Sequence, residues 1–148
     1  MDPSQVRTRI MQDHDTLREH LSELEEACLT MLSDRQHAVC VRQLAGKLLQ
    51  ALTQHTELED AILAPALAEI DAWGAVRADQ LLTHHQSQRG RIHELTSLYA
   101  TQLDAEDVSR ITHSFIAELR ADMEHEERDL LHPDLLRDDL TVVGSNSG

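Results

Sequence analysis

Apolar residues recur at steps of three and four along most of this sequence, and that spacing predicts amphipathic helices. The four stripes run through Val6, Ile10, His14, Leu17, Leu21, Leu24, Cys28 and Met31; through Val41, Leu44, Leu48, Leu52, His55, Glu59 and Ile62; through Ala78, Leu81, His85, Gln88, Ile92, Leu95 and Tyr99; and through Val108, Ile111, Phe115, Leu119, His125 and Asp129. Only five Gly and three Pro interrupt a chain rich in helix-forming residues. We therefore expect an all-α fold, an antiparallel up-down-up-down four-helix bundle.

Local signals place the helix ends and divide the chain. Asp2 followed by Pro3 is a favourable helix start, and Asp104 is expected to cap the fourth helix. The breaks are expected at Ser33-Asp34, near Pro65, around Trp73-Gly74 and at Pro133. The bundle should thus cover residues 1–135, and residues 136–148 should form a flexible tail.

Charge and composition exclude several functions. The 27 acidic and 13 basic side chains give a formal net charge of −14, which disfavours binding to nucleic acids or anionic membranes. No apolar run is long enough to span a bilayer, and the first residues lack the apolar core of a signal peptide. Cys28 and Cys40 are too few for a disulfide scaffold, so free thiols are expected. These features indicate a cytoplasmic protein, with an enclosed compartment in the cytoplasm as the alternative.

Histidine occupies a position in each helical stripe where an apolar residue would be expected. Burying an imidazole is unfavourable unless the ring has a partner, and histidine is the commonest metal ligand. The rise of 1.5 Å per residue puts the four stripe histidines within roughly one helical turn of each other. His14, His55, His85 and His125 are therefore predicted to converge on one layer of the bundle.

Two carboxylates strengthen this prediction. His55 with Glu59, and His125 with Asp129, are i,i+4 pairs, so each pair projects from one helix face. Four imidazoles and two carboxylates suit iron or manganese, with zinc as an alternative. The pair His55 and Glu59 recurs as His125 and Asp129 after 70 residues, and His14 recurs as His85 after 71, which indicates a duplicated helix hairpin around a metal site.

His84 competes with His85 for the third-helix ligand position, since it lies 70 residues after His14. The residues that follow favour His85. Ile92 and Leu95 stand at +7 and +10 from His85, as Leu21 and Leu24 do from His14.

Four segments carry a family resemblance: IMQDHDTLREHLSELE, HTELEDAILAP, HHQSQRGRIHEL and HEERDLLHP. In this order they resemble the hemerythrin (HHE cation-binding) domain family over roughly residues 6 to 133. The resemblance implies a non-haem di-iron centre, bridged by oxo or hydroxo groups and by carboxylates. The positions that match its ligands are His14, His55, Glu59, His85, His125 and Asp129.

Two departures from the family pattern bear on function. Oxygen-carrying hemerythrins have an HxxxH pair in the third helix, whereas Gln88 and Arg89 stand four residues after His84 and His85. Asp129 also replaces the Glu of many members, and its shorter reach weakens a bridge. An incomplete histidine set leaves coordination for water or substrate. We therefore expect reduction of peroxide or NO in stress protection rather than reversible O2 storage. An iron- or oxygen-responsive binding or regulatory module is the alternative, and a metal-free dimerisation domain is the third.

The remaining histidines and acids have weaker signals. His20, His37, His93 and His113 lie off the stripes and are expected on the surface. His20 and His132 also lie near enough to the site that orienting a ligand is the alternative role for them. Asp122 and Glu126 are further candidates for that orienting role. The oligomeric state is left open between a monomer and a homodimer.

The last segment resembles the cargo-loading peptides of encapsulin shells, some of whose cargoes are hemerythrin-like. Its residues are Leu140, Thr141, Val142, Val143, Gly144 and Ser145, with one Val more than the Leu-Thr-Val-Gly-Ser-like core. An extended apolar segment of this kind can dock in a groove of a partner. The resemblance implies an encapsulin shell as a partner, and a frayed terminus is the alternative.

Overall fold

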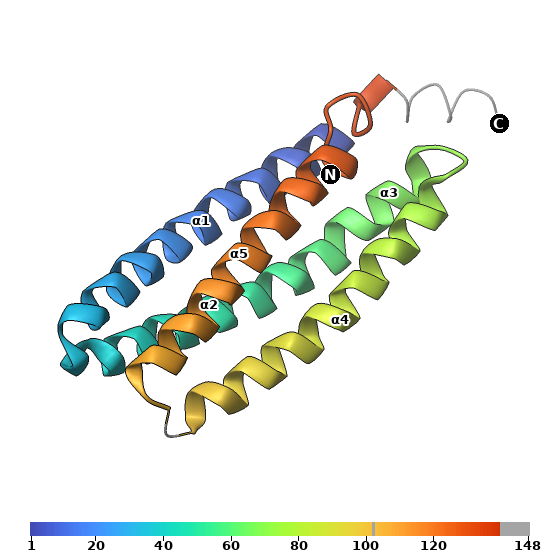
Figure 1. Ribbon diagram of the computed structural model, residues 1–148. Helices are drawn as coiled ribbons and strands as arrows, with labels where there is room; N and C mark the ends of the chain where they lie inside the picture. The colour runs from blue at the N-terminus through green and yellow to red at the C-terminus, as the bar shows by residue number, and fades with distance from the viewer. Residues whose placement is uncertain (102, 140–148) are drawn as a thin grey trace.

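Four long antiparallel helices make up the protein, as seen in a computed structural model that describes residues 1–101 and 103–139 (Figure 1). The elements are α1 (Pro3–Ser33), the short 3₁₀ turn η1 (Arg35–His37), α2 (Ala38–Leu58), the π-helical turn η2 (Glu59–Leu63), α3 (Ala64–Ile70), α4 (Gly74–Ala100) and α5 (Ala105–Asp129). No strand occurs among these described residues. The prediction of an all-α, up-down-up-down four-helix bundle is confirmed.

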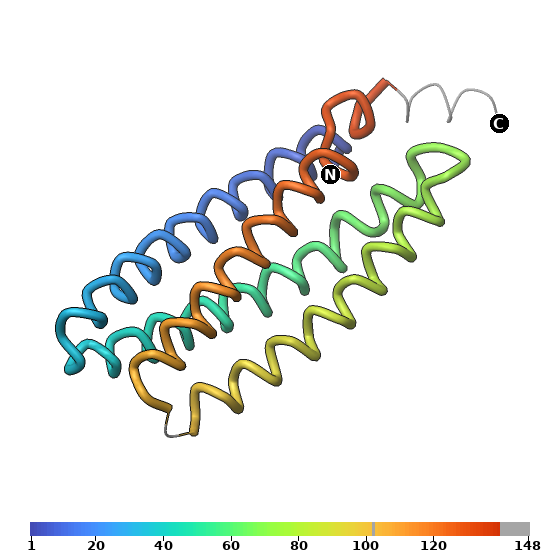
Figure 2. The backbone as a smooth tube through the Cα atoms, viewed as in Figure 1, coloured from blue at the N-terminus to red at the C-terminus, as the bar shows by residue number. Residues whose placement is uncertain are grey.

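The helices surround a common interior. α1 packs against α2 and α5, while α4 packs against α3 and α2. In the backbone trace, α2, η2 and α3 follow one another as a single rod, so the four long rods alternate in direction (Figure 2). Each level along the bundle axis is therefore lined by side chains from all four rods.

Caps and clamps fix the helix ends. The backbone N–H of Asp2 donates to Gln5 Oε1 at 2.9 Å at the start of α1, and Asp104 Oδ1 accepts from the backbone N–H of Asp107 at 2.8 Å at the start of α5. At the end of α4, the Arg42 guanidinium donates to the carbonyls of Tyr99 and Thr101 at 3.0 and 2.9 Å. These carbonyls have no partner within a helix, so Arg42 satisfies them.

The expectation that the second helix ends near Pro65 is wrong, because the rod continues through α3 to Ile70. Glu59 to Leu63 form a π turn, in which the N–H of Ala64 donates to the carbonyl of Glu59. Pro65 then falls in the first turn of α3. A proline is tolerated there because its missing N–H is not required.

Two apolar clusters fill the interior. Between them lies a polar layer that contains the buried His14, His55, Glu59 and His85. One cluster is built around Leu21, Leu24, Leu48, Leu52, Leu95, Phe115 and Leu119, and the other around Val6, Ile10, Leu63, Leu67, Leu81, Leu131 and Leu136. Along α1 the order is Ile10, then His14, then Leu17, all of them buried. No helix in the described part of the chain is long and apolar enough to cross a membrane.

The chain after α5 returns to the start of α1. Leu136 is buried in the second apolar cluster, and Asp138 accepts hydrogen bonds from the backbone N–H and the hydroxyl of Ser4, at 2.9 and 2.8 Å. The segment that resembles a cargo-loading peptide, 140–145, lies outside the described residues. Its docking to an encapsulin shell stays a prediction.

Candidate metal centre

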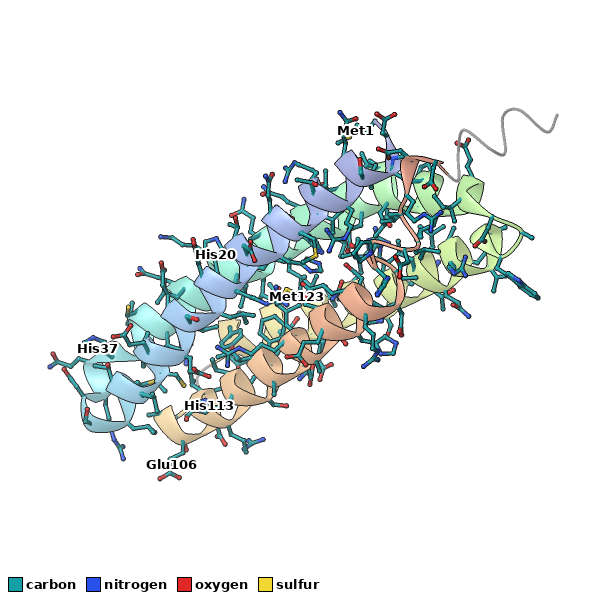
Figure 3. The ribbon with its side chains drawn as sticks, turned by 90° about the horizontal axis from the view of Figure 1, so that it is seen from above. Met1, His20, His37, Glu106, His113 and Met123 are labelled. Carbon is teal, nitrogen blue, oxygen red and sulfur yellow. The ribbon has the colours of Figure 1, made fainter. Side chains whose placement is uncertain are left out.

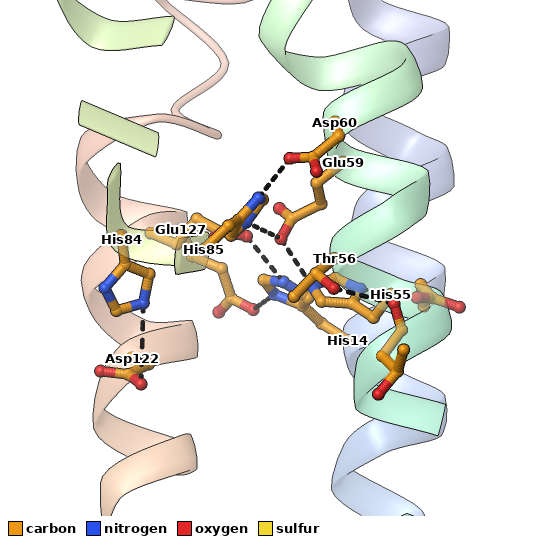
Figure 4. Close-up of polar contacts among 12 residues, drawn as sticks. His14, His55, Thr56, Glu59, Asp60, His84, His85, Asp122 and Glu127 are labelled. Carbon is orange, nitrogen blue, oxygen red and sulfur yellow. Dashed lines mark hydrogen bonds and ion pairs between the residues drawn. The ribbon is translucent and has the colours of Figure 1, made fainter. Parts of the chain in front are cut away.

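Three of the predicted histidines enter the polar layer from three helices. His14 of α1, His55 of α2 and His85 of α4 are only 0%, 4% and 0% exposed. The rings of His55 and His85 meet at Glu59, which begins the π turn after α2, and the ring of His14 lies beside that of His55 (Figure 4). A π turn shifts the helix register locally, and such turns are frequent at functional sites.

The convergent atoms lie close enough together to hold a cation. One ligand atom from each of His14, His55, Glu59 and Glu126 lies within 4.8 Å of the other three. His55 Nε2 is 2.8 Å and His85 Nε2 is 3.2 Å from Glu59 Oε1. His14 Nε2 lies 2.9 Å from Glu126 Oε1. The cluster thus joins imidazole nitrogens to two buried or nearly buried carboxylates.

Each buried imidazole also binds a second carboxylate through its other nitrogen, Nδ1. The pairs are His14 with Glu127 at 2.7 Å, His55 with Asp13 at 2.6 Å and His85 with Asp60 at 2.5 Å. Such an outer carboxylate fixes the tautomer and the ring orientation, so that Nε2 faces the centre. All three rings are therefore held in the orientation that a metal ligand needs.

An arginine stands behind each outer carboxylate. Arg18 donates to Glu127 at 2.8 Å, and Arg9 lies 3.7 Å from Asp13. Arg89 pairs with Asp60 in the same way. Three chains of arginine, carboxylate and imidazole thus run from the surface of the bundle to the polar layer.

The two inner carboxylates differ in protonation. Burial would raise the pKa of Glu59, but interactions with Glu126, His55 and His85 outweigh burial and hold that pKa well below its usual range. Burial and the neighbouring Glu59 carboxylate both raise the pKa of Glu126 well above its usual value. Of the two carboxyl groups, Glu59 is therefore the one that ionises more readily, and Glu126 the one that holds a proton more tightly.

The imidazoles respond to the same charges. Burial lowers the pKa of His14 and outweighs its hydrogen bond to Glu127. Burial also acts to lower the pKa of His55, but its hydrogen bonds to Asp13 and Glu59 raise that pKa to about 9. In the absence of a cation, bound protons therefore offset the negative charge of the carboxylates in this layer. A cation that binds there must displace these protons.

The donor set fits a metal ion. Glu59 is 1% exposed, and its Oε2 is the one buried side-chain oxygen or nitrogen without a hydrogen-bond partner among the described residues. A buried carboxylate oxygen without a partner is unfavourable unless a ligand satisfies it. Nitrogen and carboxylate donors together suit iron, manganese or zinc.

His125 and Asp129 of α5 are not brought into this cluster. Their side chains are 70% and 44% exposed, and they pair with each other at 2.9 Å. They line a pocket of about 190 Å³ between α4 and α5, together with His84, Asp122 and Glu126. Glu126 belongs both to this pocket and to the buried cluster, so the pocket borders the centre.

The structure places Glu126, rather than Asp129, beside Glu59. The sequence predicted Glu126 only as an orienting group, because the 70-residue repeat of the His-x-x-x-carboxylate pairs pointed to His125 and Asp129. Glu126 follows Met123, which is buried, by three residues, whereas Asp129 lies nearly another turn further on. The burial pattern of α5 would have been the better signal.

The other histidines are more exposed. His84 is 44% exposed and lies 3.7 Å from Asp122, whereas His85 beside it is buried. His113 is exposed and His20 and His37 are partly exposed, on the outside of the bundle (Figure 3). His132 is exposed and accepts from the backbone N–H of Asp134 at 3.1 Å. Cys28 is a buried free thiol and Cys40 an exposed one.

Comparison with known proteins supplies one match. The family model described as the hemerythrin HHE cation-binding domain matches residues 5–133, which take in all four long helices except the first two residues of α1. No curated protein and no solved structure matches the chain.

Proposed function

Because the chain belongs to the family of hemerythrin HHE cation-binding domains, we propose that it holds a non-haem di-iron centre that reduces hydrogen peroxide or NO. The observation that carries the proposal is the unpartnered Oε2 of Glu59, buried among three oriented imidazoles. Such an arrangement is unfavourable in a merely structural layer and favourable around cations.

Five residues are proposed to hold the metal: His14, His55, Glu59, His85 and Glu126. The two carboxylates lie between the imidazoles, which suits them to bridge two ions, and the imidazoles are suited to terminal positions. His125 and Asp129, which the sequence predicts as ligands, are included in the test below.

The side chains of the centre have separate tasks in this proposal. A ferrous pair held by these residues would supply the two electrons that, with two protons, reduce one hydrogen peroxide to two waters, and an external electron donor would restore the ferrous state. The Nδ1 hydrogen bonds hold the three rings still, and the apolar clusters on both sides exclude bulk water. The pocket between α4 and α5 admits a small molecule.

The preference for peroxide or NO over reversible O2 storage rests on α4. Gln88 and Arg89 stand where an oxygen carrier of this family would have a second histidine. Arg89 pairs with Asp60, and its guanidinium has no lone pair with which to bind a metal ion. Fewer protein ligands leave more positions for an exchangeable molecule.

A regulatory module is the second candidate function. Cation binding that neutralises the polar layer would change the stability of the whole bundle, and with it the affinity for a partner. Such a protein would bind iron and change its spectrum with oxidation state, but it would not consume peroxide or NO.

The test is metal analysis and optical spectroscopy of protein purified from iron-supplied cells, before and after peroxide or NO. We expect about two irons per chain and near-ultraviolet bands of a bridged ferric pair after oxidation. With an added chemical reductant that returns the ferric pair to the ferrous state, we expect loss of the added oxidant over many turnovers. Iron with no turnover would favour the regulatory module, and a stable oxygenated spectrum would favour a carrier. Absence of iron from a folded bundle would overturn the proposal.

Single substitutions test the ligand assignment. His55→Ala should lose iron, whereas His113→Ala, on the exposed face of α5, should keep it. His125→Ala distinguishes the ligand set that takes Glu126 from α5 from the set that takes His125 and Asp129. Full iron content in that variant supports Glu126 as the contribution of α5, and loss of iron supports the ligand set predicted from the sequence.

A further inference from the structure

The two halves of the bundle correspond at two fixed offsets. Buried positions of α1 recur in α4 after 71 residues, and buried positions of α2 recur in α5 after 67. The buried pairs are Ile10 with Leu81, Leu24 with Leu95, and Cys28 with Tyr99 at 71, and Val41 with Val108, Leu48 with Phe115, Leu49 with Ile116, and Leu52 with Leu119 at 67. At the same offset of 67, Glu59 corresponds to Glu126.

Two of the three arginine–carboxylate–imidazole chains obey this correspondence. One runs from Arg18 through Glu127 to His14, and the other from Arg89 through Asp60 to His85. Their members correspond as His14 to His85 and Arg18 to Arg89 at 71 residues, and as Asp60 to Glu127 at 67. The internal twofold relation therefore holds at the level of single hydrogen bonds.

The third chain has a counterpart with its residue types exchanged. His55 donates through Nδ1 to Asp13, at 2.6 Å. The counterpart of His55 at 67 residues is Asp122, and the counterpart of Asp13 at 71 residues is His84. His84 Nε2 lies 3.7 Å from Asp122 Oδ2, so the pair persists with the carboxylate on α5 and the imidazole on α4 (Figure 4).

The exchange changes the environment of the second half. The His55 side chain is 4% exposed, whereas Asp122 is 39% exposed. Aspartate is shorter than histidine, and Asp122 and Glu126 both line the pocket of about 190 Å³ that opens between α4 and α5. The second half is therefore more open to solvent than the first.

We propose that Asp122 is the ligand of the second cation at the position that His55 occupies for the first, with His84 as its positioning residue. This inference rests on the proposed two-metal function. His14 and His55 then make a nitrogen-rich position, and His85 and Asp122 an oxygen-rich one, with Glu59 and Glu126 between them. Oxygen ligands favour harder cations, and solvent access favours exchange. Because this oxygen-rich position is open to solvent, it should bind even a hard cation more weakly than the buried nitrogen-rich position does, and exchange it faster.

The experiment titrates metal-free full-length protein with Mn²⁺ and measures bound ion by electron paramagnetic resonance and calorimetry. We expect two ions per parent chain, the second bound about tenfold or more weakly than the first. Asp122→Ala should bind one ion with the first affinity unchanged. Asp122→His should bind two Zn²⁺, and its affinity for the second Zn²⁺ should be about tenfold higher than that of the parent chain for its second Zn²⁺.

Asp129→Ala is the matched control, because Asp129 lies on the same helix and the same pocket wall as Asp122. It should bind two ions as the parent does. Two unchanged affinities in Asp122→Ala, or loss of the second ion in Asp129→Ala, would overturn the inference while leaving a metal centre in place. No bound Mn²⁺, Zn²⁺ or iron in a helical parent would instead overturn the proposed function and this inference with it.

Discussion

Each buried histidine of the polar layer uses its two ring nitrogens differently. Nδ1 donates to an outer carboxylate that an arginine holds, and Nε2 faces an inner carboxylate. A ring held at one nitrogen loses little freedom when the other binds a cation. The outer carboxylates should therefore contribute to cation affinity without touching the cation.

Glu127→Ala tests that contribution. The variant removes the acceptor of His14 Nδ1 and the partner of Arg18, so cation affinity should fall by about 10- to 100-fold. Glu124→Ala, an exposed position on the same helix, is the control and should retain parental affinity in a calorimetric titration. Equal affinities in the two variants would show that the outer carboxylate does not orient the ligand.

Sequence alone identified much of this layer. His14, His55 and His85 were conspicuous because an imidazole interrupts an apolar stripe, and the structure buries all three. Glu126 was not assigned beside Glu59, because several acids and a histidine adjoin it and only packing shows which of them faces inward. The spacing of His125 and Asp129 matches that of His55 and Glu59, but spacing within a helix does not fix its rotation about its axis. Their role as ligands stays a prediction.

At the scale of helices, the turn between α3 and α4 depends on close backbone approach. A Cβ atom at Gly74 would lie 2.0 Å from the carbonyl oxygen of Leu67 and 2.9 Å from that of Ala68. Both distances are far inside van der Waals contact, and both atoms belong to the backbone. Only glycine allows α4 to begin at this point against α3.

Gly74→Ala should therefore destabilise the fold by about 1–3 kcal/mol or more, since α3 and α4 must separate. Gly46→Ala is the matched control. A Cβ at that exposed position of α2 would meet nothing within 4 Å, so the better helix propensity of alanine should stabilise by about 0.5–1 kcal/mol. Urea denaturation measures both. A neutral Gly74→Ala variant would contradict the packing argument.

Helix positions were predictable from periodicity, and helix ends only in part. The caps at Asp2 and Asp104 have clear side-chain signals, and α1 and α5 begin where these predict. Pro65 misled the prediction of an end because a π turn precedes it, and a π turn has no simple residue signature. The local register of the backbone, rather than the proline, decides whether the helix continues.

For the whole molecule, the protonated polar layer links stability to pH. Without a bound cation, hydrogen bonds to Asp13 and Glu59 outweigh burial and raise the pKa of His55 to about 9, above its usual value of 6.5. A raised pKa contributes stability that is complete below pH 6.5 and is lost as pH rises through 9. The raised pKa of Glu126 acts in the same direction, starting from lower pH.

The metal-free protein should thus lose stability, on the order of 2 kcal/mol, between about pH 6.5 and 9. Cation affinity should rise over the same range, because a cation competes with protons for the imidazoles. Thermal unfolding with and without Mn²⁺ measures both effects. The His55→Gln variant should show a flatter profile, and a parent that gains stability up to pH 9 would contradict the proton balance.

The correspondence between the hairpins has a consequence for how such a centre evolves. If residues 1–71 and their counterparts were separate identical chains, every mutation at the centre would appear on both sides at once. A covalent link between the hairpins removes that constraint, so His55 and Asp122, or Arg9 and Gln80, can diverge independently. A fused chain can therefore specialise one side for retention and the other for exchange, which an exact homodimer cannot do.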